Sequence, residues 1–138
     1  MKTILMKRVL FVLAMMGLVM QACVHKQETA MSITVNLRYT GTGGSARAFA
    51  EEMISSGTVD AIRAEEGNLR YEYFLSLDDP ETILLVDSWA NQEAIDAHHA
   101  SPMMATIATL REKYDLHMTV ERYISADTPE GESKFIRK

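Results

Sequence analysis

Three consecutive segments decide the fold: LRYEYFLSL (69–77), DDP (78–80) and ETILLVDSW (81–89). In the first segment, apolar or aromatic residues alternate with others, and a period of two is typical of a half-buried β-strand. The second segment has the composition of a turn. The third is apolar at four consecutive positions, Ile83, Leu84, Leu85 and Val86, which predicts a strand covered on both faces. We expect helices on one face of this strand and a partner subunit on the other.

The segment before these strands starts with another alternating stretch, at 33–39, which predicts a first strand with Asn36 facing away from its apolar row. Glycines within 41–44 break this strand, and we expect Ser45 to cap the helix that follows. Gly57 interrupts the helical pattern. The sequence therefore predicts a bent or two-piece helix that ends at Gly67.

The segment after the third strand predicts two more helices and a last strand. Asn91 is a plausible N-cap for a short helix through Ala100, and Pro102 stands where a second helix could begin and run to about Tyr114. Residues 116–125 form the predicted fourth strand. The order strand, helix, strand, strand, helix, strand predicts an α+β fold of the ferredoxin-like βαββαβ type, with an antiparallel sheet.

The first 22 residues have the pattern of an export signal. Lys2, Lys7 and Arg8 form a positive start, and 9–20 is an apolar or glycine stretch of 12 residues. This stretch is shorter than the roughly 20 residues that a membrane-spanning helix needs. A cleaved signal peptide over 1–22 is therefore expected.

Cys23 is the lone cysteine, and the residues before it, Val19-Met20-Gln21-Ala22, resemble a bacterial lipobox in which a small residue precedes the cysteine. The resemblance implies lipidation of Cys23 after cleavage, although Met20 and Gln21 depart from the usual residues. An ordinary signal peptide that leaves an unmodified thiol is the alternative. A single cysteine cannot form an internal disulfide, and capping would protect the thiol in an oxidising compartment. We expect a lipoprotein anchored at the bacterial cell envelope, on its periplasmic or extracellular face.

The composition suits one acidic domain. Removing residues 1–22 takes away three of the 14 basic residues and none of the 19 acidic ones, which leaves a net charge of −8. No basic patch with interleaved aromatics is present, so nucleic acid is not an expected partner. We expect a tether at 23–31, one folded domain at 32–125 and an exposed tail at 126–138.

Residues around the third strand resemble the antibiotic biosynthesis monooxygenase family. The resemblance is carried by Trp89, Glu93-Ala94, Ala97-His98 and Ser101-Pro102, and by 67–72 and 77–80, which look like the branch that oxidises quinols. It covers about residues 33–124. It implies a homodimer whose two sheets pack into an α+β barrel, with a pocket between each sheet and its own helices. It also implies insertion of oxygen from dioxygen into a small aromatic quinol or anthrone, without metal, flavin or haem. Such a substrate, once deprotonated, can itself give an electron to dioxygen, so the protein needs only to bind, desolvate and deprotonate it.

Three residues are the candidate catalytic groups. His98 matches the family's histidine and could act as a base, although a core histidine with a structural hydrogen bond is equally compatible with the pattern. Trp89 could form a pocket wall, but core or dimer packing is the commoner role of an indole at a strand end. Asn36 could hydrogen-bond a phenolate, whereas an exposed polar position on a strand explains it more simply. His99 departs from the family, which usually has an apolar residue there.

Aromatic and flexible side chains are the candidates for lining the pocket. They are Tyr71, Tyr73, Phe74, Met103 and Met104. A metal site is not expected, because His98 and His99 are adjacent on one helix and no Cys cluster or His-x-x-x-His pair accompanies them.

These residues leave three functions open. The first is a monooxygenase, acting without a cofactor on a small aromatic quinol or anthrone. The second is degradation of haem, because members of the same superfamily use an Asn, Trp and His set and this chain offers Asn36, Trp89 and His98. The third is a non-catalytic module that binds a small molecule in the same pocket.

Overall fold

The computed structural model describes residues 31–137, so the predicted signal peptide, Cys23 and most of the tether lie outside the described residues. The elements are β1 (Ile33–Thr40), α2 (Ser45–Ser55), α3 (Thr58–Arg63), β2 (Asn68–Leu75), β3 (Thr82–Trp89), α4 (Gln92–His99), α5 (Met103–Lys113), β4 (His117–Ile124) and a 3₁₀-helix, η1 (Glu130–Phe135). The helix in two pieces and the four strands appear in the predicted order. The ferredoxin-like α+β fold is therefore confirmed.

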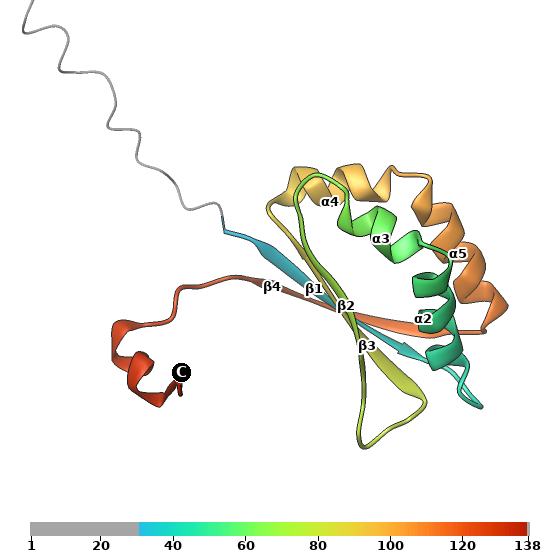
Figure 1. The fold of residues 1–138 in the computed structure, drawn as a ribbon, viewed down its shortest axis with the longest axis horizontal. Coiled ribbons are helices and arrows are strands. Elements are labelled where there is room, and N and C mark those ends of the chain that lie inside the picture. Colours follow the sequence, from blue (N-terminus) through green and yellow to red (C-terminus); the bar gives the residue numbers. More distant parts are fainter. Residues whose placement is uncertain (1–30, 138) are drawn as a thin grey trace, which may run out of the picture.

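The four strands form one antiparallel sheet in the order β2-β3-β1-β4. All four α-helices lie on the same face of this sheet (Figure 1). The core lies between the two layers, and its largest fully buried side chains include Trp89, Tyr39, Phe49, Met53 and Ile62. Burying an apolar side chain of this size stabilises the fold by about 1.5–3 kcal/mol. Sheet and helices are thus held together by a continuous apolar layer.

The start of α2 differs from the prediction that Ser45 is its cap. Gly44 is the N-cap residue, with a φ of 82° in the left-handed region that glycine adopts at little cost. The Gly44 N–H donates to the Glu81 carboxylate, 3.0 Å from Oε2, whereas Ser45 Oγ accepts from the Thr42 N–H. The prediction was wrong because the carboxylate of Glu81, in the turn before β3, accepts the N–H of the N-cap residue Gly44, while the Ser45 hydroxyl accepts from the preceding loop.

The second strand is shorter than its alternation predicts. It ends at Leu75, and Leu77 lies in the turn, where it is fully exposed. A register shift between Asn68 and Arg70 interrupts the pairing with β3 and leaves Leu69 exposed. Tyr71 and Tyr73 therefore form the inward row of this strand.

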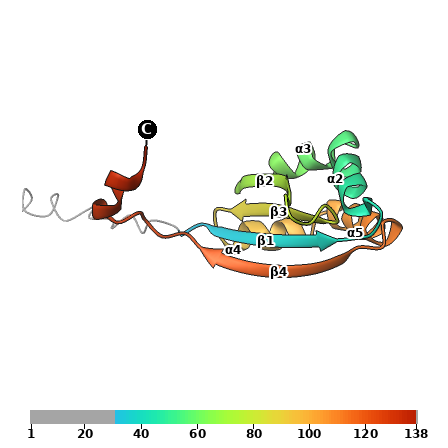
Figure 2. The same ribbon diagram turned by 90° about the horizontal axis from the view of Figure 1, so that it is seen from below.

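The face of the sheet opposite the helices is open among residues 31–137, as Figure 2 shows with α4 and α5 behind the strands. The register places on this open face Asn36, Phe74, Leu84, Val86 and Tyr123, together with charged side chains. Leu84 and Val86 are half-buried, while Phe74 and Tyr123 are 41% and 50% exposed. The prediction that a partner subunit covers this face stays a prediction.

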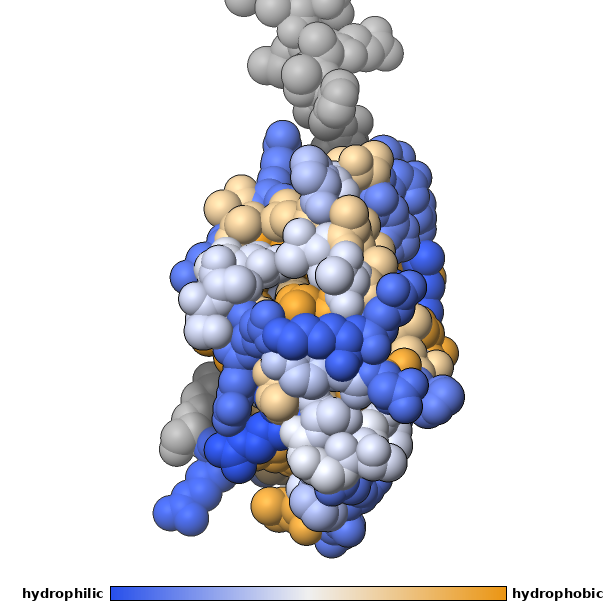
Figure 3. Space-filling model, turned by 90° about the vertical axis from the view of Figure 1, so that its right-hand side faces the viewer, coloured by the Kyte–Doolittle hydropathy of each residue, from blue (hydrophilic) through white to orange (hydrophobic). Residues whose placement is uncertain are grey.

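The segment after β4 is exposed throughout residues 126–137 and contains η1 (Figure 2). The end of the molecule where α2 and α5 lie is largely hydrophilic, with apolar side chains showing only in small patches (Figure 3). None of the helices in the described part of the chain is long and apolar enough to span a membrane.

Candidate functional site

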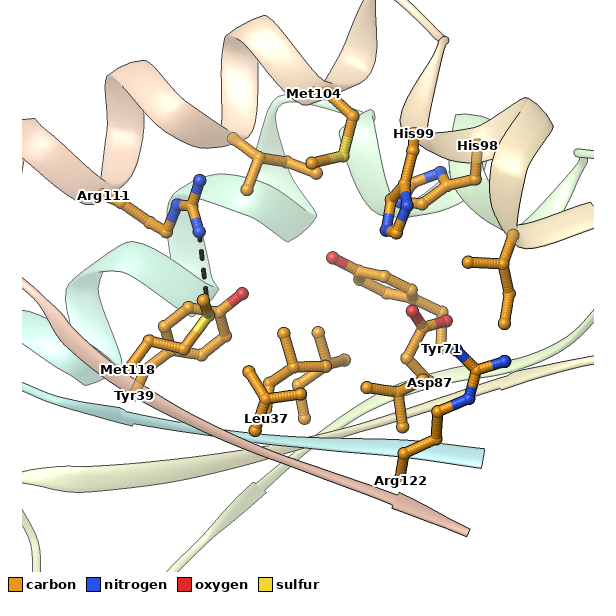
Figure 4. Close-up of a pocket in the computed structure, with 15 residues that line it drawn as sticks. Leu37, Tyr39, Tyr71, Asp87, His98, His99, Met104, Arg111, Met118 and Arg122 are labelled. Carbon is orange, nitrogen blue, oxygen red and sulfur yellow. Dashed lines mark hydrogen bonds between the residues drawn. The ribbon is translucent and has the colours of Figure 1, made fainter. Parts of the chain in front are cut away.

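A pocket of about 300 Å³ lies between the sheet and the helices α4 and α5 (Figure 4). Its size is at the lower end of the range for small-molecule sites. Its walls are mostly apolar, and its polar lining residues are Tyr39, Tyr71, Asp87, His98, His99, Arg111 and Arg122. An apolar cavity with a few polar groups suits a small, flat organic ligand.

The floor of the pocket is built by the inward rows of β1, β2 and β3. On β1 the inward residues are Val35, Leu37 and Tyr39, and the register sets Val35 beside Asp87 and Tyr39 beside Ile83. The outer wall comes from the edge strand β4, whose lining side chains Met118, Val120 and Arg122 are all exposed. The pocket is therefore buried at β3 and reaches solvent along β4.

The position of α4 depends on two local features. Asn91 caps the helix, since its side chain accepts the Ala94 N–H at 2.9 Å, as the sequence predicts. Gly67 has a φ of 82°, and a Cβ there would stand 2.6 Å from Ala94 Cβ. A larger residue at 67 would thus push α4 off the sheet, and with it His98.

His98 is buried and lines the pocket. Its Nδ1 lies 2.6 Å from Oε2 of Glu65, which stands in the turn between α3 and β2. An ionised carboxylate can only accept a hydrogen bond, so Nδ1 is the donor in this contact, and in the neutral form of the ring the lone pair lies on Nε2. Nε2 makes no hydrogen bond within residues 31–137. Nε2 of the neutral ring is therefore the atom of His98 that can accept a proton.

Trp89 packs against the His98 ring, with ring centroids 4.9 Å apart and an interplanar angle of 31°. The indole is 1% exposed, and its Nε1 has no hydrogen-bond partner within the described residues. Trp89 is not itself a lining residue. It holds one side of the imidazole while Glu65 holds Nδ1, so the ring has a fixed orientation.

Asp87 is a buried carboxyl group on the pocket floor that the sequence reasoning missed. It is 8% exposed, and its Oδ1 has no hydrogen-bond partner in the described part of the chain. Burial raises the pKa of Asp87 to about 6, and the neighbouring Trp89 and His98 side chains oppose this rise only in part. The sequence did carry a signal. Asp87 is a charged residue in the otherwise apolar inward row of the third strand, between Leu85 and Trp89.

Two tyrosines complete the polar lining of the interior. Burial raises the pKa of Tyr39 to about 12 and raises the pKa of Tyr71 still further. Both hydroxyls are therefore protonated at neutral pH and can donate hydrogen bonds to a ligand. Figure 4 shows the Tyr71 hydroxyl directed into the cavity.

The structure brings together some of the sequence-predicted site residues and separates others. His98, Tyr71 and Met104 line the pocket, and Trp89 packs behind His98. Met103 and Tyr73 pack against the core instead, the latter edge-on to the Phe49 ring.

Asn36 and Phe74 do not reach this pocket. Both stand on the open face, because they alternate with residues that point toward the helices. The Oδ1 of Asn36 is buried there without a partner in residues 31–137. The predicted set of Asn36, Trp89 and His98 is therefore not assembled within one subunit. Residues 31–137 also contain no group of three or more His, Cys, Asp or Glu side chains placed to hold a metal ion.

A family model for antibiotic biosynthesis monooxygenases matches residues 32–110, which is more than half of the chain. The chain belongs to the antibiotic biosynthesis monooxygenase family. This result confirms the resemblance to the family, but it does not distinguish the branch of the family. No curated protein sequence matches the chain closely enough to be counted as a relative.

Several solved structures share the fold of this chain. One is SnoaB from Streptomyces nogalater, described as a cofactor-independent oxygenase, with a TM-score of 0.60, 17% identity, and coverage of 73% of this chain and 99% of SnoaB. A protein from Pseudomonas aeruginosa has a TM-score of 0.61 and 19% identity, and the match covers 72% of this chain and 98% of that protein. A protein from Shewanella oneidensis has a TM-score of 0.59 and 22% identity, and the match covers 70% of this chain and 92% of that protein. At these identities the likeness shows a common fold.

Proposed function

We propose that this pocket binds a small aromatic quinol or anthrone-like molecule and that the protein oxidises it with dioxygen without a cofactor. The observation that carries the proposal is the His98–Glu65 pair at the wall of an apolar pocket. Membership of a monooxygenase family supports the same reaction class. The pocket volume of about 300 Å³ suits a ligand of two or three fused rings at most.

In the proposed reaction, His98 Nε2 takes a proton from the substrate hydroxyl or from the activated ring carbon. The resulting anion gives an electron to dioxygen, and the two radicals combine to form a bond between carbon and oxygen. One oxygen atom stays in the product and the other leaves as water with two hydrogens from the substrate. A quinol plus dioxygen then gives a hydroxyquinone plus water, and an anthrone gives an anthraquinone plus water. No external reductant is needed, because the substrate supplies all four electrons.

Two other groups have roles in this proposal. Glu65 fixes the tautomer of His98 and stabilises the imidazolium that forms when the ring takes the proton. Asp87 lies on the floor of the same pocket, and its raised pKa of about 6 allows it to exchange a proton near neutral pH. We assign to Asp87 the proton transfer to the oxygen atom that leaves as water.

Haem degradation is not proposed, because Asn36 lies on the opposite face of the sheet from His98 and Trp89.

A panel of quinols, anthrones and haem tests the proposal. The expected result is oxygen uptake with a quinol or an anthrone and no reductant-dependent loss of haem absorbance. A ligand that binds without any oxygen uptake would instead indicate a binding module.

We also propose that the mature protein is a homodimer and that its open faces pack against each other. The apolar side chains Leu84, Val86, Phe74 and Tyr123 on that face support this proposal.

Lipidation of Cys23 and attachment to the cell envelope remain a proposal that rests on the sequence alone.

A further inference from the structure

Arg111 is a half-buried cation on the pocket side of α5 that has no anionic partner. Among residues 31–137 it forms no ion pair, and its Nη1 donates only to the Met118 sulfur, at 3.6 Å. A thioether is a weak acceptor and carries no charge. A guanidinium held against apolar walls is stabilised most by a planar anion that accepts two hydrogen bonds from it.

No other arginine of the domain combines a place at the pocket with an unused guanidinium. Arg38 also forms no ion pair within residues 31–137, but it is exposed on the open face of the sheet. Arg47, Arg63 and Arg70 each contact a carboxylate. Arg122 also lines the pocket, but it is exposed and donates to the Gln92 amide oxygen. Arg111 is therefore the pocket cation whose hydrogen-bonding capacity is least used.

Arg111 stands at the end of the pocket opposite to His98 and Asp87. Tyr39 pairs in register with Met118, whose sulfur accepts the hydrogen bond from Arg111, so the Tyr39 and Arg111 side chains lie at the same end of the pocket (Figure 4). Asp87 pairs in register with Val35, and Val35 and Tyr39 are four residues apart on β1, which corresponds to about 13 Å along the strand. Figure 4 shows the Arg111 guanidinium across the cavity from Asp87 and His98.

We infer that the substrate of this pocket is an aromatic acid, with its ring hydroxyl at His98 and a carboxylate bound by Arg111 at the other end. The inference rests on the proposed function, since it names the class of substrate for that site. The apolar residues between the two ends, such as Leu37 and Ile107, would contact the faces of the ring. The Tyr39 hydroxyl beside Arg111 is a second donor for the carboxylate.

Two compounds of the same shape test this inference: 6-hydroxy-2-naphthoate and its uncharged analogue 6-hydroxy-2-naphthamide. Their binding to the full chain is measured by calorimetry at pH 7 without oxygen, so that no turnover is required. The parent should bind the naphthoate about tenfold or more tightly than the naphthamide, as expected for a charge-assisted hydrogen bond. Arg111→Gln should abolish this preference and leave naphthamide binding within about twofold, whereas Arg111→Lys should retain part of it. Arg47→Gln, an exposed arginine on α2, is the matched control and should behave like the parent.

Equal affinity of the parent for the two compounds would overturn the inference. A preference that survives Arg111→Gln, or no binding of either compound at millimolar concentration, would overturn it as well. The parent comparison needs no variant, so the test holds even if Arg111→Gln is poorly folded. The proposed oxygenase reaction is judged separately by oxygen uptake, and either result can fail without the other.

Discussion

His98 Nδ1 and Glu65 Oε2 are 2.6 Å apart, although the two residues are separated by 33 positions and lie on different segments of the helical layer. The histidine is 5% exposed and the carboxylate 19%, so the contact is largely removed from water. A contact of this kind orients the imidazole and fixes which nitrogen carries the proton. The proposed mechanism depends on it.

Glu65→Gln should lower kcat by about ten- to a hundredfold while KM changes little, because the amide cannot stabilise the imidazolium as the carboxylate does. Thermal unfolding should stay close to that of the parent, since the glutamine can still accept the Nδ1–H hydrogen bond. The neighbouring exposed residue supplies the control, Glu66→Gln. An unchanged kcat for Glu65→Gln would remove the pair from the mechanism.

His98→Gln should lower kcat by about a hundredfold or more, in line with the contribution of a general base. The glutamine amide can donate a hydrogen bond to Glu65, so this variant keeps a partner for the carboxylate. His98→Ala removes that partner and should lower the free energy of unfolding by about 1–3 kcal/mol. Comparing the two variants by urea unfolding and by turnover separates the structural role from the catalytic role. Full activity in His98→Gln would show that the histidine is structural.

Asp87→Asn should stabilise the protein at pH 8 by up to about 3 kcal/mol, because the parent must bury a charge there. The folded-state pKa of Asp87, about 6, is above the ordinary aspartate value of 3.8, so the contribution of Asp87 to stability is complete below pH 4 and is lost as the pH rises through 6. Urea unfolding between pH 4 and 8 measures the difference between the two proteins. The exposed turn variant Asp78→Asn is the control. A constant difference across this range would contradict the assigned pKa.

Val86→Glu should convert a dimer into a monomer, because it places a charge at the centre of the open face. Sedimentation at micromolar concentration measures the mass of both proteins. Thr106→Glu, at an exposed position on α5, should leave the dimer intact. A monomeric parent would refute the proposed assembly.

The strand order and the helix positions could be predicted because each element has its own local pattern. The alternation at 33–39 and the apolar run at 83–86 both form strands, and Asn91 caps α4, as the sequence predicts. The cap of α2 could not be predicted in this way, since Glu81 is 37 positions away from Gly44 and approaches it only because β1 pairs with β3. The register shift near Leu69 also depends on pairing with β3 and leaves no local pattern.

The candidate site was predicted in part for similar reasons. His98 could be predicted as a site residue because the sequence around it resembles the family pattern. Its contact with Glu65 could not, because the two residues are 33 positions apart and meet only in the folded chain. Asn36 is a candidate only because of its residue type, and the alternation of β1 predicts that it lies on the other face of the sheet, where the structure has it. Asp87 shows the converse, because the alternation of the third strand predicts its inward position, whereas its burial and raised pKa depend on the packed helices.

Cys23→Ser should release the protein from the membrane fraction and abolish labelling by a lipid precursor, because the serine offers no thiol to modify. Fractionation of cells that express the parent and the variant measures this. If both proteins fractionate alike, the predicted lipoprotein signal is wrong.

Turnover of a quinol or anthrone under ¹⁸O₂ tests the central claim most directly. The sample contains the purified full chain and no added metal, flavin or reductant, and the product is analysed by mass spectrometry. The proposed reaction places one labelled oxygen atom in each product molecule and the other in water, with one dioxygen consumed per product. A product without label, formed while oxygen is consumed, would contradict monooxygenase chemistry.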